Sequence, residues 1–320
     1  MINHPELPVI CLMGPTASGK TQLAISLYQK FPFHIVSVDS AMVYRGMDIG
    51  TAKPSQEELT IAPHELIDIC DPSESFSAGQ FHQEAISLIN KIHQAGKIPL
   101  LVGGTMLYFS ALQRGLATLP PANLEIREKL NQQAQEKGWE KLHSELSKID
   151  PAAADKIKPQ DKQRIQRAWE VYLITGRAIS EMQQSSEKLP GTMINLALGV
   201  EKRSSLHQRI EMRVTKMFHQ GFIDEVKALY QRSDLAANLP AIRSVGYRQI
   251  WQWLENGKLN EKSDLTVLKE QVVIATRQLA KRQMTWLRSW QNLTWFDSES
   301  SCLVEDVTHY LKSSFPIQLQ

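Results

Sequence analysis

The segment GPTASGKT at residues 14–21 is the feature that most constrains the fold of this chain. It matches the phosphate-loop pattern G-x-x-x-x-G-K-[ST], and it lies between a short apolar run at 9–13 and a periodic segment at 21–28. A buried strand, a glycine-rich loop and a helix in this order are the context in which the loop binds phosphate. The segment therefore predicts an α/β fold with a parallel sheet at its centre.

The residue types of this loop indicate what it binds. Glycines let backbone N–H groups surround phosphate oxygens, the lysine reaches an outer phosphate, and the threonine hydroxyl can bind Mg²⁺. We expect Mg²⁺ as cofactor, with Thr21 as a metal ligand. The expected diphosphate- or nucleotide-binding residues are Gly14, Pro15, Thr16, Ala17, Ser18, Gly19, Lys20 and Thr21.

Further apolar runs define the domain organisation. The runs at 34–38 and 98–102 predict parallel strands, so residues 1–120 should form the first part of a phosphate-loop NTPase-like core. An apolar run at 193–200 predicts that the sheet resumes there. Residues 190–320 should then complete the core and carry C-terminal helices, with long helices over 205–230 and 265–290.

The intervening residues 121–189 are predicted to be an all-helical insertion domain. The stretch 124–148 is rich in Glu, Gln, Lys and Leu at helical spacing. Asp150 followed by proline is typical of a helix N-cap with proline at the first helical position. Asp161 and Gly176 should cap the two ends of another helix.

Composition and charge narrow the class of protein. The chain has 42% hydrophobic and 22% charged residues, and its early apolar run is far shorter than the roughly 20 residues that span a bilayer. Three widely spaced cysteines, Cys11, Cys70 and Cys302, predict neither a disulfide framework nor a zinc site, which fits a reducing cytoplasm. We also expect a monomer without a membrane partner. Residues 201–290 hold 16 Lys plus Arg against 9 Asp plus Glu, which is typical of a polyanion-binding surface and also of a solvated helical surface.

A phosphate loop alone does not define the reaction. Kinases and ATPases commonly place an Asp at the end of an apolar strand to hold Mg²⁺, but the strand at 99–102 runs into Gly103-Gly104-Thr105. Asp39 follows the apolar run 35–38 and could act as a magnesium-shell ligand or as a base. A small-molecule or nucleoside kinase and a non-catalytic RNA-binding protein are the alternative interpretations.

Longer segments identify the family that the chain resembles, the bacterial tRNA dimethylallyltransferases of the IPP transferase family. The resemblance is carried by GPTASGKT at 14–21, DSAMVYRGMDIGTAKP at 39–54, PHELIDICDP at 63–72, LLVGGTMLYFSAL at 100–112, DKQRIQRAWEVYLITG at 161–176, AIRSVGYRQIW at 241–251 and TRQLAKRQMTWLR at 276–288. It implies transfer of a dimethylallyl group from dimethylallyl diphosphate to N6 of adenosine 37, next to the anticodon, with release of diphosphate. Met42 departs from the Gln of many relatives, and the zinc finger of eukaryotic relatives does not follow, which indicates a bacterial type.

The resemblance also implies the catalytic residues. Asp39 should accept the proton of the N6 amine as the C–N bond forms. Lys20, the loop amides, Thr105 and an arginine should stabilise the departing diphosphate, and Arg213 is expected in this role ahead of Arg209. The reaction class is alkyl transfer, without phosphoryl transfer.

The expected acceptor is the anticodon stem-loop of tRNA, because an exocyclic amine must be unpaired or flipped out to reach a buried donor. The resemblance implies that the helical insertion domain 121–189 and the C-terminal helices of 190–320 bind this tRNA. Arg277, Lys281, Met284 and Arg288 share one helical face and could meet phosphates. Trp251, Trp253, Trp286, Trp290 and Trp295 are expected in the core rather than on RNA. The expected tRNA-binding residues are Asp39, Ser40, Ala41, Met42, Thr105, Arg127, Gln163, Arg164, Ile165, Gln166, Arg167, Arg243, Ser244, Val245, Gly246, Tyr247, Arg248, Arg277, Lys281 and Arg288.

Overall fold

The computed structural model describes residues 7–117, 119–183, 186–187, 191–257 and 262–314. The chain divides into two compact units, Met1–Ser110 with Pro190–Gln320 and Ala111–Leu189. The second unit begins earlier than the predicted boundary at residue 121. The reason is that β5 (Leu116–Ala117) pairs antiparallel with β6 (Ser186–Glu187), so both connections to the helices belong to the second unit.

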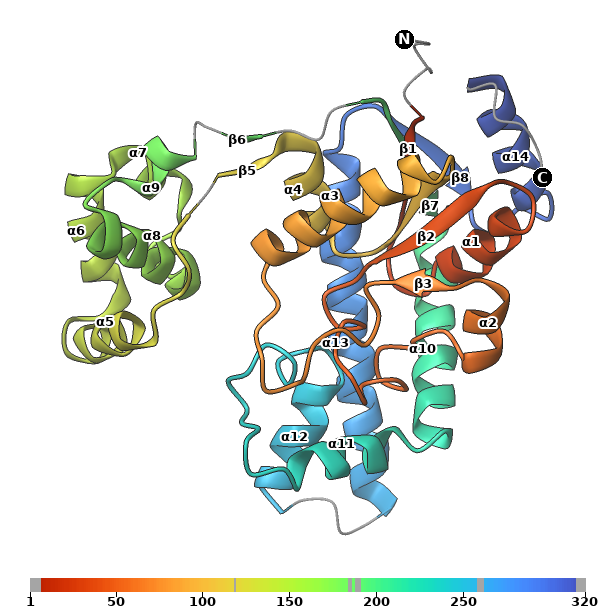
Figure 1. The fold of residues 1–320 in the computed structure, drawn as a ribbon. Helices are drawn as coiled ribbons and strands as arrows, with labels where there is room; N and C mark the ends of the chain where they lie inside the picture. The colour runs from red at the N-terminus through yellow and green to blue at the C-terminus, as the bar shows by residue number, and fades with distance from the viewer. Residues whose placement is uncertain (1–6, 118, 184–185, 188–190, 258–261, 315–320) are drawn as a thin grey trace. The chain divides into compact units, whose positions relative to one another are not determined.

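The first unit is built on a six-stranded sheet in the order β3-β2-β4-β1-β7-β8, and every described pairing in it is parallel (Figure 1). The four strands expected from apolar runs are confirmed. They are β1 (Val9–Met13), β2 (Phe33–Val38), β4 (Ile98–Gly103) and β7 (Met193–Gly199). The sequence did not predict the short β3 (His64–Glu65) or the half-exposed edge strand β8 (Leu293–Asp297).

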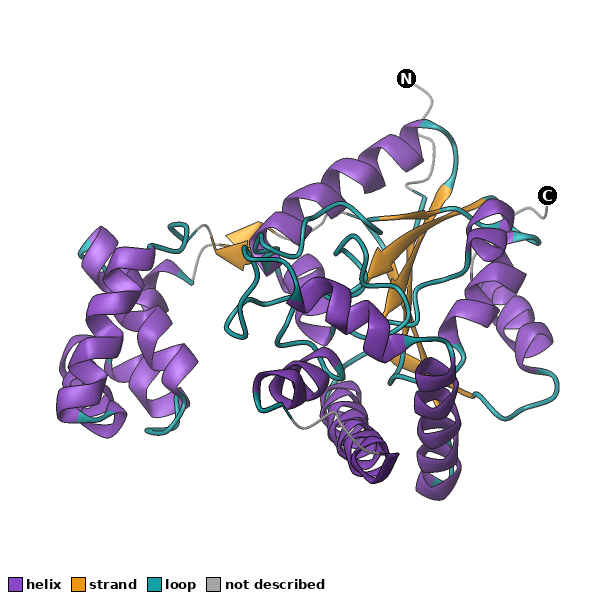
Figure 2. Cartoon of the chain, turned by 90° about the horizontal axis from the view of Figure 1, so that it is seen from below, coloured by secondary structure: helices purple, strands orange, loops and turns teal. Residues whose placement is uncertain are grey.

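Helices cover the sheet on both faces, as its fully buried central strands require (Figure 2). On one face, α1 (Lys20–Tyr28) and α14 (Leu303–Ser314) pack in one apolar cluster with alternate strand residues, among them Ile10, Leu12 and Leu196. Helix α3 (Ala78–Gln94) packs against β4, and α4 (Met106–Arg114) follows β4 along the chain. The short helix α2 (Gln56–Ile61) precedes β3.

The strand order places three loops at one edge of the sheet. Gly103 lies opposite both Val38 of β2 and Met13 of β1, so the carboxyl ends of these strands are neighbours. A Cβ added to Gly103 would lie 2.0 Å from the Val38 carbonyl oxygen, which explains why the position needs glycine. Ligands of parallel sheets bind at the carboxyl ends of the strands, so we expect a ligand-binding site at this edge.

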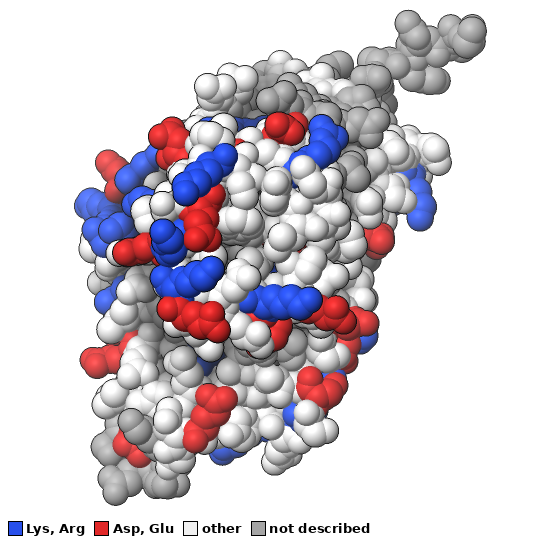
Figure 3. Space-filling view, turned by 90° about the vertical axis from the view of Figure 1, so that its left-hand side faces the viewer, with Lys and Arg blue, Asp and Glu red and all other residues white. Residues whose placement is uncertain are grey.

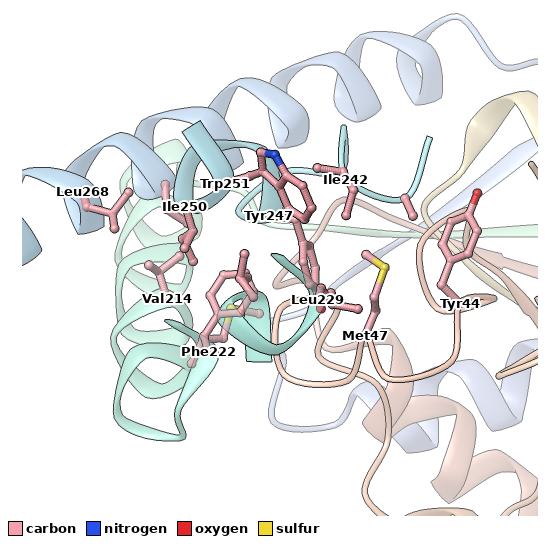
Figure 4. Close-up of a cluster of buried hydrophobic side chains, with 14 of the residues drawn as sticks. Tyr44, Met47, Val214, Phe222, Leu229, Ile242, Tyr247, Ile250, Trp251 and Leu268 are labelled. Atoms are coloured by element: carbon pink, nitrogen blue, oxygen red, sulfur yellow. The ribbon is translucent and has the colours of Figure 1, made fainter. Parts of the chain in front are cut away.

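A second helical layer completes this unit. Helices α10 (Arg203–His219), α11 (Phe222–Tyr230), α12 (Tyr247–Glu255) and α13 (Lys262–Arg288) share a buried apolar cluster (Figure 4). The prediction of one continuous helix over 205–230 was wrong. Gly221 has a φ of 96°, a left-handed conformation that ends α10 and opens α11.

The second unit is helical, with α5 (Leu124–Lys137), α6 (Trp139–Ile149), α7 (Pro151–Lys156), α8 (Lys162–Thr175) and α9 (Ile179–Met182). The predicted caps are confirmed. The Asp150 carboxylate accepts from the Ala153 N–H at 2.9 Å, and Asp161 caps α8, which ends at the left-handed Gly176. No helix in the described part of the chain is long and apolar enough to cross a membrane.

Candidate active site

The phosphate loop links β1 to α1, which begins at Lys20. Gly19 takes a φ of 86°, and this left-handed residue turns the chain into the helix. The Lys20 ammonium folds back over the loop, donating to the Pro15 carbonyl at 2.7 Å and to the Ser18 hydroxyl at 3.4 Å. The lysine is therefore held at the concave side of its own loop.

The charge of Lys20 depends on its surroundings. Its pKa is lowered from 10.5 to about 7, mainly by burial and also by the nearby Arg213 guanidinium, while Asp39 acts in the opposite direction. Burial likewise lowers the pKa of Arg213, again opposed by Asp39. Two basic side chains in a partly desolvated site favour a polyanionic ligand, whose charge would stabilise the guanidinium of Arg213 and the protonated form of Lys20.

One cavity of about 150 Å³ connects the loop to the neighbouring strand ends. Its lining includes apolar residues, among them Met217, Phe222 and Val272. It also includes many of the residues that the sequence predicts for the site: Thr16, Lys20, Thr21, Asp39, Ala41, Met42, Arg213, Ser244, Val245, Gly246 and Tyr247. A second cavity of about 950 Å³, lined by Ala17 and Gly19, shares Lys20, Thr21 and Arg213 with the first.

Asp39 lies directly after β2, where its carboxylate holds a tight turn. Its Oδ1 accepts from the N–H of Ala41 at 2.9 Å and of Met42 at 3.3 Å. The Thr105 hydroxyl accepts from the Ser40 N–H at 3.0 Å and donates to the Ser40 hydroxyl at 3.3 Å. Thr105 is not among the described residues that line the cavity, so in this structure it supports the turn that carries Asp39.

The two candidate arginines of α10 have different partners. Arg213 lines the cavity and donates through Nη2 to the Thr51 carbonyl at 3.1 Å. Arg209 donates to the hydroxyl of Ser298 at 3.0 Å and lies 4.0 Å from the Glu299 carboxylate. Of the two, the structure places Arg213 with Lys20 and Asp39.

Sequence reasoning missed Gln283 of α13, which joins two loops at the site. Its side-chain oxygen accepts from the Thr16 N–H, and its amide nitrogen donates to the Gly104 carbonyl, both at 2.9 Å. A signal was present, because Gln283 falls on the buried stripe of its helix with Ala280 and Leu287. A polar residue on a buried helix face needs hydrogen-bond partners, and here they are the loop residues.

His64, the first residue of β3, was also missed, although it lines the cavity. Its Nδ1 lies 2.7 Å from the Ala62 carbonyl oxygen, so this nitrogen carries the proton. Burial lowers the pKa of His64, which favours the neutral ring.

The segment RSVGYR at 243–248 contributes residues to two different cavities. Tyr247 is fully buried, and its hydroxyl donates to Glu225. Arg243 and Arg248 line another pocket of about 380 Å³, together with Trp251. The prediction that tryptophans lie in the core is confirmed for Trp251, which is 3% exposed.

Several residues of the helical unit predicted to bind tRNA have partners within the unit. Glu170 is fully buried and accepts from Arg127 Nε at 2.8 Å and from Arg167 Nη1 at 2.5 Å. Burial alone would raise the pKa of Glu170, but these hydrogen bonds outweigh burial and lower it. Ile165 is fully buried, so its side chain belongs to the core of the unit and the prediction that it contacts tRNA was wrong for the side chain.

The other polar residues of this segment differ in their surroundings. Gln166 donates to the Asn131 side chain at 2.9 Å, whereas Gln163 and Arg164 are exposed. Acidic and basic side chains are interspersed on the face that Figure 3 shows. That face therefore carries no continuous basic field.

The predicted basic face of α13 is partly neutralised. Arg277 pairs with Glu211 at 3.2 Å, while Lys281 and Arg288 are exposed. The tryptophan prediction was wrong for Trp286 and Trp295, which are 40% and 42% exposed.

The fold and this cavity define a class, the α/β enzymes whose phosphate loop shares a cavity with a carboxylate that follows another strand of the same parallel sheet. Among the described residues no cluster of three or more His, Cys, Asp or Glu could hold a metal ion. A sequence model of the family described as IPP transferase matches residues 42–290. The chain belongs to this IPP transferase family.

Relatives resemble the chain over almost all of its length. A tRNA dimethylallyltransferase of Coxiella burnetii is 53% identical over 306 residues, which cover 95% of this chain and 97% of that protein. The full-length tRNA isopentenylpyrophosphate transferase of Bacillus halodurans is 35% identical, with a TM-score of 0.69 and coverage of 96% of both chains. A eukaryotic dimethylallyltransferase described as acting on tRNA has 27% identity and a TM-score of 0.80, covering 98% of this chain and 81% of that one.

Proposed function

We propose that this protein transfers the dimethylallyl group of dimethylallyl diphosphate to N6 of adenosine 37 in the anticodon stem-loop of tRNA, releasing diphosphate. The observation that carries the proposal is that Lys20, Arg213 and Asp39 line one cavity. Such a cavity can hold the leaving group at one side of the reacting carbon and a proton acceptor at the other. The working unit is proposed to be a monomer in the cytoplasm.

The donor side stabilises charge that grows on the leaving diphosphate. The loop N–H groups, Lys20 and Arg213 supply positive charge where the C–O bond breaks. Mg²⁺ usually takes one or two protein oxygens together with substrate phosphates, and the Thr21 hydroxyl fits this donor set. Bound there, Mg²⁺ would neutralise part of the diphosphate charge.

The acceptor side must activate a weak nucleophile. The lone pair of the adenine N6 amine is delocalised into the ring, so the nitrogen becomes strongly acidic only as it bonds to carbon. The Asp39 carboxylate can accept that proton while its Oδ1 stays bonded to the turn at Ala41 and Met42. These hydrogen bonds fix the carboxylate before the substrate arrives.

The kinase alternative has less support from the site. Strand β4, which neighbours β1, continues into Gly104 and Thr105 and offers no carboxylate for a phosphoryl-transfer metal. Nucleoside mass spectrometry after incubation with dimethylallyl diphosphate and tRNA should show N6-prenylated adenosine. Production of ADP from ATP, without prenylated nucleoside, would overturn the proposal in favour of a kinase.

A further inference from the structure

Glu225, in the first turn of α11, joins three chain segments at the wall of the cavity. Its Oε2 accepts from the N–H groups of Asp48 at 2.9 Å and Ile49 at 2.8 Å. Its Oε1 accepts from the Gly50 N–H at 3.1 Å and from the Tyr247 hydroxyl at 2.5 Å. Four donors thus converge on one carboxylate, although Glu225 does not line the cavity among the described residues.

The first of these segments holds the arginine of the donor site. Gly50 and Thr51 line the cavity, and the Thr51 carbonyl accepts from Arg213 at 3.1 Å. A Cβ added to Gly50 would lie 2.1 Å from the Phe222 ring, so this segment is packed tightly against α11. A shift of the segment would displace the carbonyl that orients Arg213.

The second segment also lines the cavity and lies beside the first, since a Cβ added to Gly50 would lie 2.6 Å from the Tyr247 ring. Tyr247 opens α12 and follows Ser244, Val245 and Gly246, all of which line the same cavity. Its ring lies in the apolar cluster with Phe222 at a centroid distance of 5.0 Å (Figure 4). Burial, together with the Glu225 charge, raises the pKa of Tyr247, so its hydroxyl stays a donor to the carboxylate.

The chemistry of the contact requires a carboxylate. All four partners use an N–H or O–H toward Glu225, and only an ionised carboxyl offers acceptors on both of its oxygens. A glutamine of the same shape would turn an NH₂ group toward at least one backbone N–H. A donor without an acceptor is then left on the segment that carries Thr51.

We infer that Glu225 is a positioning residue, which holds the segment 48–51 so that Arg213 meets the diphosphate, and ties that segment to the 244–247 wall. This inference rests on the proposed function in one respect, the prenyl transfer in which Arg213 is proposed to bind the diphosphate. It predicts that Glu225 acts through Arg213. Residues that act through one another show non-additive effects when both are replaced.

The test is a double-mutant cycle with Glu225→Gln, Arg213→Gln and the double variant. Dimethylallyl diphosphate affinity is measured by calorimetry, and kcat and KM by prenyl transfer to tRNA. We expect Glu225→Gln to weaken donor binding about 10-fold and lower kcat by up to about 100-fold, since a displacement of about 1 Å has effects of that size. In the Arg213→Gln background the same replacement should change both quantities less than about threefold.

Asp224→Asn is the matched control, because it removes one carboxylate from the same helical turn. Asp224 is exposed and pairs with the surface residue Lys227. The effect of this replacement on donor affinity and kcat should stay within about twofold. Equal effects of Glu225→Gln in both Arg213 backgrounds would overturn the inference, because they would show a general loss of structure.

A second variant covers the case in which Glu225→Gln does not fold. Tyr247→Phe removes one of the four donors and keeps the buried ring, so it should lower kcat about 3- to 10-fold and do so only with Arg213 present. Equal losses with and without Arg213 would count against the inference. Wild-type protein that binds the donor but prenylates no tRNA would refute the proposed function, while the cycle measured on donor affinity would still decide the role of Glu225.

Discussion

Asp39 has two tasks that a substitution can separate. Its Oδ1 accepts from two backbone N–H groups of the following turn, and the same carboxylate is proposed to take the proton of the amine. Asparagine keeps an oxygen for the turn but is not a base. Asp39→Asn therefore tests the chemistry with the local geometry preserved, whereas alanine would remove both tasks.

We expect Asp39→Asn to lower kcat by about 10²-fold or more, the usual contribution of a general base. The affinity for tRNA should stay within about threefold, because the base acts in the transition state. Single-turnover transfer and equilibrium tRNA binding check both values. A variant that retains more than about a tenth of wild-type turnover would exclude Asp39 as the base.

Lys20 gives the site a pH dependence. With a pKa of about 7, it is largely neutral near pH 8, and a bound diphosphate favours its charged form. Donor binding should then take up close to one proton, and donor affinity should fall as pH rises above about 7. Calorimetry in buffers of different ionisation enthalpy measures this uptake, which Lys20→Met should abolish.

The sign of the stability effect follows from the same shift. The folded pKa of Lys20 lies below its ordinary value of 10.5, so the unfolded chain binds more protons between about pH 7 and 10.5. Lys20 therefore makes stability rise with pH across that window. Heats of donor binding that do not depend on the buffer would contradict a depressed pKa.

Single residues were predictable from sequence where a motif fixed their local geometry. The phosphate loop and Asp39 follow apolar strands directly, and the parallel sheet brings their ends together. Gln283 and Glu225 reach the site across separations of 267 and 177 residues from their partners Thr16 and Asp48. No local pattern encodes such contacts, since they depend on how α11 and α13 pack.

At the scale of elements, helix boundaries were predicted best where caps mark them. Asp150, Asp161 and Gly176 sit where their chemistry requires. The break between α10 and α11 was missed because the apolar spacing at Leu206, Ile210, Val214 and Met217 predicts another apolar residue at 221. Gly221 occupies that position, and the apolar residue follows at Phe222. The shift by one residue, together with the glycine, is the signal for a break.

The buried Glu170 should be an anchor of the helical unit. Glu170→Gln replaces the carboxylate that Arg127 and Arg167 share, and should lower the free energy of unfolding by about 2 kcal/mol. Guanidinium unfolding of the full chain measures the change, with the exposed Glu136→Gln of α5 as control. Equal stabilities of the two variants would contradict an anchoring role.

The same residue predicts a response to acid. Because the pKa of Glu170 is lowered in the folded state, its contribution is fully present above the ordinary value of 4.5 and is lost as pH falls through the folded value. Wild-type protein should therefore lose part of its advantage over Glu170→Gln below about pH 4. An advantage that does not change with pH would show that the charge of Glu170 is not responsible.

At the scale of the whole molecule, the sequence predicted the parallel sheet and its position around the phosphate loop. It did not predict that a strand near the C-terminus, β8, pairs with β7 at the edge of the sheet. Strand β8 is a short, half-exposed edge strand, and its apolar residues are too few to show strand periodicity. Its place depends on pairing with Asn195–Gly199, a long-range contact.

The charge excess of residues 201–290 can be tested as a property of the molecule. Arg277, Lys281 and Arg288 lie on one face of α13, and Arg277 is already paired with Glu211. If this face meets tRNA phosphates, replacing all three by Gln should weaken tRNA binding. It should also flatten the dependence of log affinity on log salt by about 0.7 for each phosphate that the variant no longer neutralises.

The control is a triple replacement of equal charge, Lys30→Gln, Lys91→Gln and Lys312→Gln, at exposed positions of the sheet-covering helices and their ends. Both triple variants lower the net charge equally, so only a local interaction with tRNA separates their salt slopes. Dimethylallyl diphosphate affinity should be unchanged in both, because the phosphate loop is untouched, and helicity should persist because Gln is a good helix former. Equal salt slopes for the two variants would exclude the α13 face from the tRNA surface and leave the exposed Gln163 and Arg164 of the helical unit as the next residues to test.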